Sequence, residues 1–401
     1  MKALPAWVDV DLDALAHNIA VVRGLVGPRT RILLIVKADA YGHGAVEIAR
    51  EAVRGGVYML GVATVDEGRE LRAAGIDAAV LLLSPALPDE IPAILDAELR
   101  TTIPDLDFAA QLAAAARRRG VLAPVHVEVD TGMGRSGVLA DAAAGWIERV
   151  ASLPGILLEG VFTHFPVSDT DVEFTREQCR RLAGIVAALR AAGITIPLVH
   201  ASNSAGILQV PEAQLDLVRP GGLLYGCMPH PALTAVAPVR PVMSFRARLV
   251  QVRRLPPRTP ISYGGDVVTC RDTVLGVVPV GYGHGLSRAY SGHGSMLVRG
   301  RRVPILGRIT MDMTMVDLSG LDAPCVGEEV IVFGRQGDAE IGVDEIAAKT
   351  GVIGYEVLCG ISKRVVRVYR RAGGVESMRG LTGPRAVQVE WAEPVRTDDA
   401  P

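Results

Sequence analysis

The first part of the chain repeats one pattern, in which a short apolar run is followed by a turn and then by a stretch with helical spacing. Residues 31–38 (RILLIVKA) are apolar and rich in β-branched side chains, and GAVEIAREAV after them has the spacing of an amphipathic helix. Seven further apolar runs follow, at 59–65, 79–84, 100–104, 124–130, 157–165, 198–203 and 215–221. Eight strand-and-helix units within about 200 residues predict an α/β fold with a (β/α)8 TIM-like barrel.

A doubly wound sheet is the alternative for such a pattern. That fold needs a Gly-x-Gly-x-x-Gly turn after its first strand, and YGHGAVE supplies two glycines and no third. The barrel is therefore favoured.

The pattern changes near residue 235. Helical spacing fades, and Pro and Gly separate short Val-rich runs such as TVLGVVPVG, SMLVRG and EEVIVFG. We therefore expect a barrel domain over residues 1–235, a mostly-β C-terminal domain over 236–385, and a tail with a loose end over 386–401.

Composition and net charge indicate the fold class and the kind of molecule that the protein binds. Hydrophobic residues make up 49% of the 401 residues and aromatic residues 4%, which suits strands covered by helices. The net charge of −2, without long runs of one sign, argues against nucleic acid as a partner and favours a small molecule.

Cysteine usage and the N-terminus predict a cytoplasmic protein. Cys179, Cys227, Cys270, Cys325 and Cys359 lie far apart without a CxxC pair, so we expect neither a metal site nor a disulfide framework. The start MKALPAWVDVDLD has no apolar signal region, and no apolar run approaches the length of a membrane span. We expect no membrane partner.

Polar residues follow the predicted barrel strands at the points where they end. Lys37 ends the first strand, and a lysine at the end of a buried strand is either a Schiff-base amine or a side chain that reaches solvent at the barrel mouth. Other strands are followed by Arg135, His164, Asn203, Ser204, Arg219, Gly221 and Gly222. Since the active site of such a barrel lies at the carboxyl ends of its strands, these groups predict a site there, and the Gly-Gly pair with Ser204 suits a phosphate.

A series of motifs resembles one known family. VKADAYGHG, DTGMGR, THF, NSAG, VRPGGLLYG, ISYGG, PVGYGHG, GRITMDM and YEVLCGISKRVVRVY occur in the order found in alanine racemases, between about Ala6 and Tyr369. The resemblance implies an isomerase of fold type III that uses pyridoxal 5'-phosphate (PLP), takes a small amino acid and supplies D-alanine for peptidoglycan. It also implies a homodimer in which each β domain completes the active site of the other subunit.

The resemblance assigns the catalytic bases. Lys37 would carry PLP and handle the α-proton on one face, and Tyr263 of the other subunit would serve the opposite face. Racemisation needs two such groups because a planar carbon loses its proton to one side and regains it from the other. His164 and Arg219 would support Tyr263, and Arg219 would also face the ring nitrogen of PLP.

Further residues would bind the cofactor and the substrate. Arg135 would contact both, and Asn203 belongs with the cofactor residues. The resemblance assigns the phosphate to Tyr41, Ser204, Tyr355, Gly221 and Gly222, and the substrate pocket to Met311, Tyr282 and, at its entrance, Arg288. The remaining histidines receive no role: His17, His43, His126, His200, His230, His284 and His293.

The sequence departs from the family pattern at Glu128, where many alanine racemases have a lysine that becomes carbamylated and holds the arginine. Glu128 alternates with Val127 and Val129 along one strand, so it should face the barrel interior near Arg135. A carboxylate is shorter than a carbamylated lysine, so contact through water or a shifted backbone is one possibility, and an ion pair unrelated to catalysis is another. We expect activity without a bicarbonate requirement.

Two other departures concern substrate choice. His284 stands where the family usually has an acidic residue, and Gly222 where a bulkier residue is common. They leave open a racemase of broader specificity for serine, lysine or another amino acid. A fold-type-III decarboxylase is a less favoured alternative, because it would share the barrel lysine but would not need Tyr263 as a second base. A non-catalytic PLP-binding protein is another, because that family resembles only the barrel and not the β segment that carries Tyr263 and Met311.

Overall fold

The computed structural model describes residues 4–385, which form two compact units. The barrel unit comprises residues 14–40 and 45–240, and the β unit comprises residues 4–13, 41–44 and 241–385. The tail predicted for residues 386–401 lies outside the described residues.

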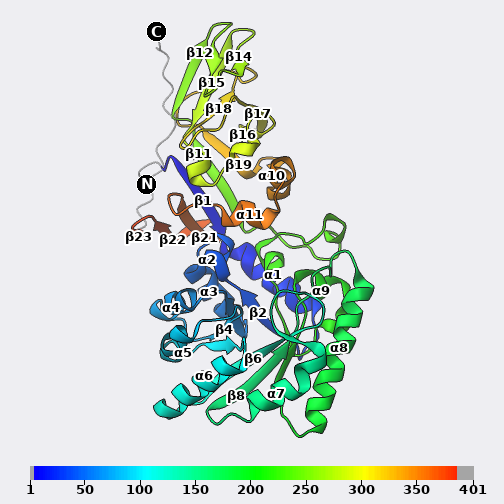
Figure 1. The fold of residues 1–401 in the computed structure, drawn as a ribbon. Coiled ribbons are helices and arrows are strands. Elements are labelled where there is room, and N and C mark those ends of the chain that lie inside the picture. The colour runs from blue at the N-terminus through cyan, green and yellow to red at the C-terminus, as the bar shows by residue number, and fades with distance from the viewer. Residues whose placement is uncertain (1–3, 386–401) are drawn as a thin grey trace. The chain divides into compact units, whose positions relative to one another are not determined.

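Eight parallel strands close into a barrel (Figure 1). They are β2 (Arg31–Ile35), β3 (Met59–Val62), β4 (Ala79–Leu82), β5 (Arg100–Thr102), β6 (Ala123–Asp130), β8 (Ile156–Phe162), β9 (Leu198–His200) and β10 (Leu217–Val218). Neighbouring strands pair in chain order, and β10 pairs with β2 to close the ring. The predicted barrel is confirmed, with each strand inside or within one residue of its predicted range.

Helices surround the barrel strands (Figure 1). They are α1 (Leu12–Leu25), α3 (Ala45–Arg54), α4 (Val65–Ala73), α5 (Ile91–Asp96), α6 (Leu106–Arg119), α7 (Ala143–Ala151), α8 (Val172–Ala191) and α9 (Ser204–Gln209). In α6, Phe108, Leu112 and Ala116 recur at helical spacing and are buried. Asp105 caps its first turn by accepting the N–H of Phe108 at 2.7 Å.

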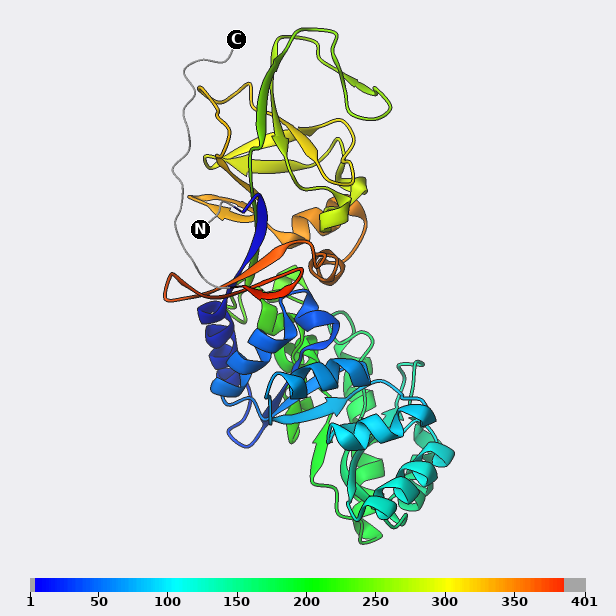
Figure 2. The same cartoon turned by 90° about the vertical axis from the view of Figure 1, so that its left-hand side faces the viewer.

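The β unit is built on a large sheet (Figure 2). Its strands are β1 (Ala6–Asp11), β11 (Met243–Arg248), β12 (Gln251–Leu255), β15 (Thr273–Val278), β16 (Ser295–Val298), β17 (Arg301–Leu306), β18 (Thr314–Asp317), β19 (Glu329–Gln336), β20 (Ala339–Ile341), β21 (Val366–Arg371), β22 (Gly374–Gly380) and β23 (Gly383–Arg385). A hairpin of β13 (Pro260–Ile261) and β14 (Val267–Val268) and two helices, α10 (Val343–Thr350) and α11 (Gly354–Cys359), complete it. The predicted mostly-β domain is confirmed.

The N-terminal strand β1 belongs to the sheet of the β unit. It pairs antiparallel with β11 and parallel with β21, and Trp7 packs there with Val366, Val368 and Met378. The predicted boundary grouped this segment with the barrel, because its strand partners lie hundreds of residues away and leave no mark on the local pattern.

The helices between residues 4 and 385 are each too short or too polar to cross a membrane.

Candidate active site

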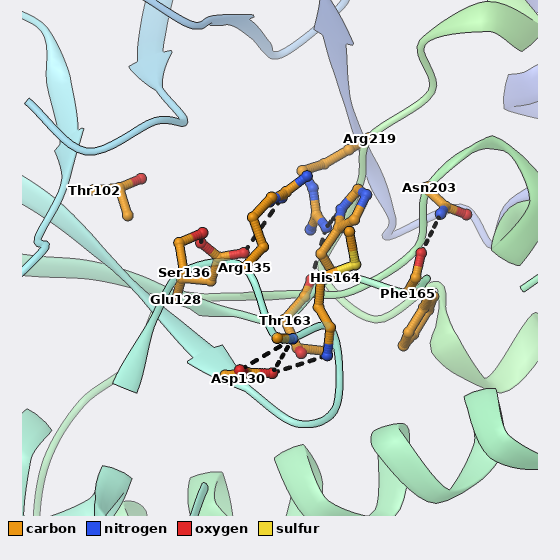
Figure 3. Close-up of polar contacts among 12 residues, drawn as sticks. Thr102, Glu128, Asp130, Arg135, Ser136, Thr163, His164, Phe165, Asn203 and Arg219 are labelled. Carbon is orange, nitrogen blue, oxygen red and sulfur yellow. Dashed lines mark hydrogen bonds and ion pairs between the residues drawn. The ribbon is translucent and has the colours of Figure 1, made fainter. Parts of the chain in front are cut away.

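Polar side chains from four strand ends gather at the carboxyl-terminal rim of the barrel unit. Lys37 follows β2, Arg135 follows β6, His164 follows β8 and Arg219 follows β10. The positive charges of Arg219, Arg135 and Lys37 all act on the imidazole of His164. The structure thus brings together four residues that the sequence predicted from separate motifs. Figure 3 shows three of them: Arg135, His164 and Arg219.

The backbone directly after Lys37 makes a left-handed turn. Ala38, Asp39, Ala40 and Tyr41 have φ values of 53°, 54°, 53° and 52°. Such residues cost about 1–2 kcal/mol each in this region, so the surrounding contacts must hold the turn. Glu67 accepts the N–H of Ala38 at 2.7 Å, and Asp39 accepts the N–H of Ala45 at 2.8 Å. These two carboxylates fix the direction in which the chain leaves Lys37.

Arg219 is buried among hydrogen-bond acceptors. Its Nη1 lies 2.7 Å from Nδ1 of His200, and its Nη2 donates to the carbonyl oxygens of Thr163 at 2.7 Å and Ala201 at 2.9 Å. Nη2 also lies 3.2 Å from Nδ1 of His164 (Figure 3). A guanidinium cannot accept a hydrogen bond, so both histidines present a lone pair to Arg219.

The electrostatics of the rim keep Arg219 charged and His164 neutral. Burial lowers the pKa of Arg219 to about 10, with the charge of Glu128 opposing this shift and that of Arg135 adding to it. Burial and then the charges of Arg219, Arg135 and Lys37 lower the pKa of His164 to about 3. At neutral pH, His164 therefore accepts at Nδ1 and carries its proton at Nε2.

Asp130 shapes the turn that carries Arg135. Its Oδ1 accepts the N–H groups of Gly132, Met133 and Gly134 at 2.9, 2.8 and 3.1 Å (Figure 3). Burial would raise the pKa of Asp130, but these three donors outweigh it and lower the pKa. Asp130 is therefore an ionised anchor for the turn, a role that the motif match did not include.

Glu128 is buried beside Arg135, as the alternation along β6 predicts. Its side chain is 3% exposed, and its Oε1 lies 3.6 Å from Nη2 of Arg135, whose side chain is 53% exposed. Ser136 donates its hydroxyl to the other carboxylate oxygen at 2.6 Å (Figure 3). The carboxylate of Glu128 thus forms a direct ion pair with Arg135.

Ser204 and Gly221 are joined at the rim. The hydroxyl oxygen of Ser204 accepts the N–H of Gly221 at 3.1 Å and that of Leu223 at 3.3 Å. A hydroxyl that accepts from the backbone keeps its own hydrogen for an outside acceptor. Gly222 begins a short 3-10 helix over Gly222–Tyr225. The oxygen of a phosphate is a suitable acceptor for this hydroxyl hydrogen of Ser204.

Asn203 positions Ser204. Its side-chain oxygen caps α9 by accepting the N–H of Gly206 at 3.0 Å and also accepts from Ser168 at 2.8 Å. Its amide nitrogen donates to the carbonyl of Phe165 at 3.1 Å (Figure 3). These contacts make Asn203 a support for the start of α9.

The other predicted site residues lie in the β unit. Tyr263 is 71% exposed in the turn between β13 and β14, where Ser262 has a φ of 63° and donates to the carbonyl of Arg308 at 2.6 Å. The rings of Tyr41 and Tyr355 meet edge to face with centroids 5.7 Å apart.

Backbone hydrogen bonds join the segment of Tyr282 to the segment of Met311. The N–H of Tyr282 donates to the carbonyl oxygen of Thr310 at 3.0 Å, and the N–H of Gly283 donates to the carbonyl oxygen of Met311 at 2.9 Å. A Cβ at Gly281 would lie only 2.6 Å from the Met311 carbonyl oxygen, so this approach requires glycine. His284 accepts the N–H of Gly281 at 3.2 Å, which supports the same turn. Arg288 opens the next 3-10 helix, Arg288–Tyr290.

Two histidines without a predicted role contact the site. His200 accepts a hydrogen bond from Arg219, and its Nε2 lies 2.9 Å from Nδ1 of His126. Nε2 of His126 in turn lies 3.1 Å from Oε2 of Glu159. His126, Glu159 and His200 lie on three different barrel strands, so the motifs did not predict that they contact one another.

A barrel with a lysine, two arginines and a neutral histidine at its strand ends, joined to a mostly-β unit, has the architecture of a barrel enzyme with its site at the carboxyl ends of the strands. Residues 10–229 match the family model of the alanine racemase N-terminal domain, and residues 242–369 match that of the C-terminal domain. The chain therefore belongs to the alanine racemase family, as the motifs predicted.

Individual relatives agree over nearly the whole length. Alanine racemase 2 of Caldanaerobacter subterraneus is 41% identical over 92% of this chain and 96% of its own, and the alanine racemase of Desulfovibrio desulfuricans is 43% identical over 91% and 98%. The solved alanine racemase of Clostridium difficile is 33% identical, with a TM-score of 0.91 over 95% of this chain and all of its own. These relatives support alanine racemase function rather than the decarboxylase or non-catalytic alternatives.

Proposed function

We propose that this enzyme interconverts L-alanine and D-alanine by a two-base mechanism, with PLP at the barrel rim and Tyr263 supplied by a second copy of the chain. The single observation that carries the proposal is the convergence of Lys37, Arg135, His164 and Arg219 at one end of the barrel. The bacterial relatives support extending it to a cytoplasmic enzyme that supplies D-alanine for peptidoglycan.

The donor set at the rim fits PLP. Lys37 offers the amine, Ser204 a hydroxyl whose hydrogen is not used in its contact with Gly221, and Arg219 a buried cation. The family resemblance adds the backbone of Gly221 and Gly222 to the phosphate site. Tyr41 and Tyr355 are the further phosphate residues that the family resemblance assigns. Bound there, PLP would supply an electron sink that makes the α-proton of the amino acid acidic.

Arg219 would control how strongly the pyridine ring of PLP withdraws electrons. Its pKa of about 10 keeps Arg219 protonated at neutral pH, so it would donate a hydrogen bond to the ring nitrogen of PLP and transfer no proton. A neutral ring nitrogen withdraws electrons weakly. Reprotonation of the α-carbon would then be favoured over side reactions such as transamination.

The two bases act on opposite faces of the α-carbon. Lys37 takes or returns the proton on one face, and the phenol oxygen of Tyr263 does so on the other. A phenol is ordinarily half ionised only near pH 10, so its anion needs a hydrogen-bond donor. His164 provides the Nε2–H as a neutral donor, since its Nδ1 faces Arg219 at 3.2 Å.

Substrate binding uses the carboxylate. Arg135 offers a guanidinium that is half exposed at the rim, and the backbone of Met311 from the second copy adds a donor. Tyr282 narrows the pocket and Arg288 lines its entrance. These residues hold alanine with its α-carbon between the two bases.

The test compares the wild type with Lys37→Ala. We expect the wild type to show the visible absorbance of a PLP Schiff base and to convert L-alanine to D-alanine, and the variant to lose both. Lys349→Ala, which changes a lysine paired with Glu345 on α10, serves as the matched control and should keep both. A wild type without the absorbance band, or Lys37→Ala with unchanged activity, contradicts the proposal.

Specificity is tested with a substrate panel. Gly222 and His284 depart from the family pattern, and His284 supports the turn of Tyr282 through Gly281. We expect alanine to have the highest kcat/KM among alanine, serine and lysine. A higher value for serine or lysine would assign the broader-specificity alternative.

A further inference from the structure

A chain of polar side chains runs from Arg219 through the interior of the barrel. Nη1 of Arg219 lies 2.7 Å from Nδ1 of His200, Nε2 of His200 lies 2.9 Å from Nδ1 of His126, and Nε2 of His126 lies 3.1 Å from Oε2 of Glu159. Arg100, at the start of β5, forms an ion pair with the same oxygen at 3.4 Å. The chain therefore connects the predicted cofactor site with the amino-terminal side of the barrel.

The positions of the protons along this chain follow from its two ends. Arg219 can only donate, so Nδ1 of His200 accepts and its proton lies on Nε2. This Nε2–H donates to Nδ1 of His126, which leaves the proton of His126 on Nε2. That proton points at Glu159, and an ionised carboxylate can only accept. One arrangement of protons satisfies all three contacts, provided that both rings are neutral.

Burial favours neutral rings. His126 and His200 are both 0% exposed. Burial lowers the pKa of each, with the charge of Arg219 as a further cause for both rings, while Glu159 opposes the shift for His126. The opposite end is more open, since the side chains of Glu159 and Arg100 are 16% and 27% exposed. The negative charge that orients the chain thus lies where water can solvate it.

The rings are also held by close packing. His200 stacks on Phe162 with centroids 4.7 Å apart and 11° between the ring planes. The ring of His126 lies against Gly160, where an added Cβ would be 2.4 Å from Nδ1. Gly160 has no side chain in the space that His126 needs, so an alanine there would force the ring to move.

We propose that His126 and Glu159 are positioning residues for Arg219: Glu159 fixes the proton of His126 on Nε2, His126 fixes that of His200 on Nε2, and His200 thereby presents its Nδ1 lone pair to the guanidinium. With the other tautomer of His200, two N–H groups would face each other at Nδ1 and Nη1, and Arg219 would have to move. The effect on catalysis rests on the proposed function, whereas the tautomers can be measured without it.

The first test measures ring ¹⁵N NMR shifts of ¹⁵N-histidine-labelled protein. The signals are assigned with single-histidine substitutions. We expect His126 and His200 of the wild type to be neutral Nε2–H tautomers between pH 6 and 9. Detection of an Nδ1–H tautomer or of a charged ring at either residue would overturn the proposal. A wild type that has these tautomers but no racemase activity would refute the proposed function alone.

The second test substitutes Glu159 and measures the tautomers of His126 and His200, with a matched control variant. Glu159→Gln replaces an obligate acceptor with an amide that also donates, so His126 and His200 should become tautomer mixtures. Glu177→Gln removes a carboxylate that pairs with Arg180 and Arg181 on α8, and should change neither ring. Glu159→Asp keeps a carboxylate and should retain the wild-type tautomers.

Gly160→Ala displaces the ring of His126 without any change of charge. We expect it to give the same tautomer mixture at His200 and to lower kcat roughly tenfold or more, as misplaced supporting groups and wrong tautomers do elsewhere. Gly184→Ala on α8, where an added Cβ meets nothing within 4 Å, is the control. If both Glu159→Gln and Gly160→Ala fold, by their melting temperatures, and keep the wild-type His200 signal, the proposal is wrong.

Discussion

Glu128 and Arg135 form an ion pair at the rim of the barrel, with 3.6 Å between Oε1 and Nη2. This distance exceeds that of a hydrogen bond, and Ser136 takes the other oxygen at 2.6 Å. The carboxylate therefore acts on Arg135 through its charge. We therefore expect this anion to replace the carbamylated lysine of many alanine racemases.

Activity should accordingly be independent of added bicarbonate. The ion pair is half exposed on the Arg135 side, and such pairs contribute about 0.2–1 kcal/mol, so Glu128→Gln should raise the KM for alanine by no more than about fivefold. Initial rates with and without bicarbonate check the first expectation. Glu128→Lys is the informative companion, since it should acquire stimulation by bicarbonate. Stimulation of the wild type would contradict the assigned role of Glu128.

Replacement of Tyr263 by Phe should separate proton exchange from racemisation. Lys37 remains as a base on one face, so the α-hydrogen of only one alanine enantiomer should exchange with deuterium, while racemisation falls by about 100-fold or more. Mass spectrometry of each enantiomer after incubation in D2O measures both. Tyr58→Phe, on a half-exposed tyrosine of the barrel unit stacked with Arg31, should leave both rates unchanged. Equal exchange of both enantiomers in Tyr263→Phe would show that this phenol is not the second base.

Arg219→Glu should raise transamination relative to racemisation. The buried guanidinium of Arg219 would donate to the ring nitrogen of PLP without protonating it, whereas a carboxylate would stabilise a protonated ring that withdraws electrons more strongly. The measurement counts pyruvate formed per racemisation turnover. An unchanged ratio in a folded, PLP-loaded variant would remove Arg219 from the control of reaction type.

The stability of the protein should fall as the pH drops below 6.5. The pKa of His164 is lowered from 6.5 to about 3 in the folded protein, so between these values the unfolded chain binds the extra proton and stability rises with pH. At pH 5 this single group costs about 2 kcal/mol relative to neutral pH. The lowered pKa values of His126 and His200 act in the same direction.

Urea unfolding at pH 7.5 and pH 5 measures this effect. His164→Gln should lose about 2 kcal/mol of the difference between the two pH values, because glutamine takes up no proton. His293→Gln, at an exposed histidine, is the control and should retain the wild-type difference. An identical difference in His164→Gln and the wild type would show that His164 does not remain neutral in the folded protein.

Much of the fold followed from local patterns. The eight apolar runs became the eight barrel strands because a buried parallel strand needs an apolar side chain at nearly every position, and this requirement is visible in the chain itself. The residues at the strand ends were equally visible, since a barrel brings the ends of its strands to one rim. Lys37, Arg135, His164 and Arg219 could therefore be predicted together.

Contacts between distant strands could not be predicted in this way. His126 on β6 and His200 on β9 appeared as isolated histidines, and they meet only after the barrel closes, where Gly160 leaves room for the ring. β1 pairs with β11 and β21 in the sheet of the β unit. The sequence pattern did not predict this pairing because both partners lie far along the chain from β1. By itself the sequence determined the barrel, the family and the residues at the rim, since these depend on local periodicity and on motifs. The tertiary structure decided which buried side chains touch, because hydrogen bonds between strands depend on register and packing that no local pattern contains.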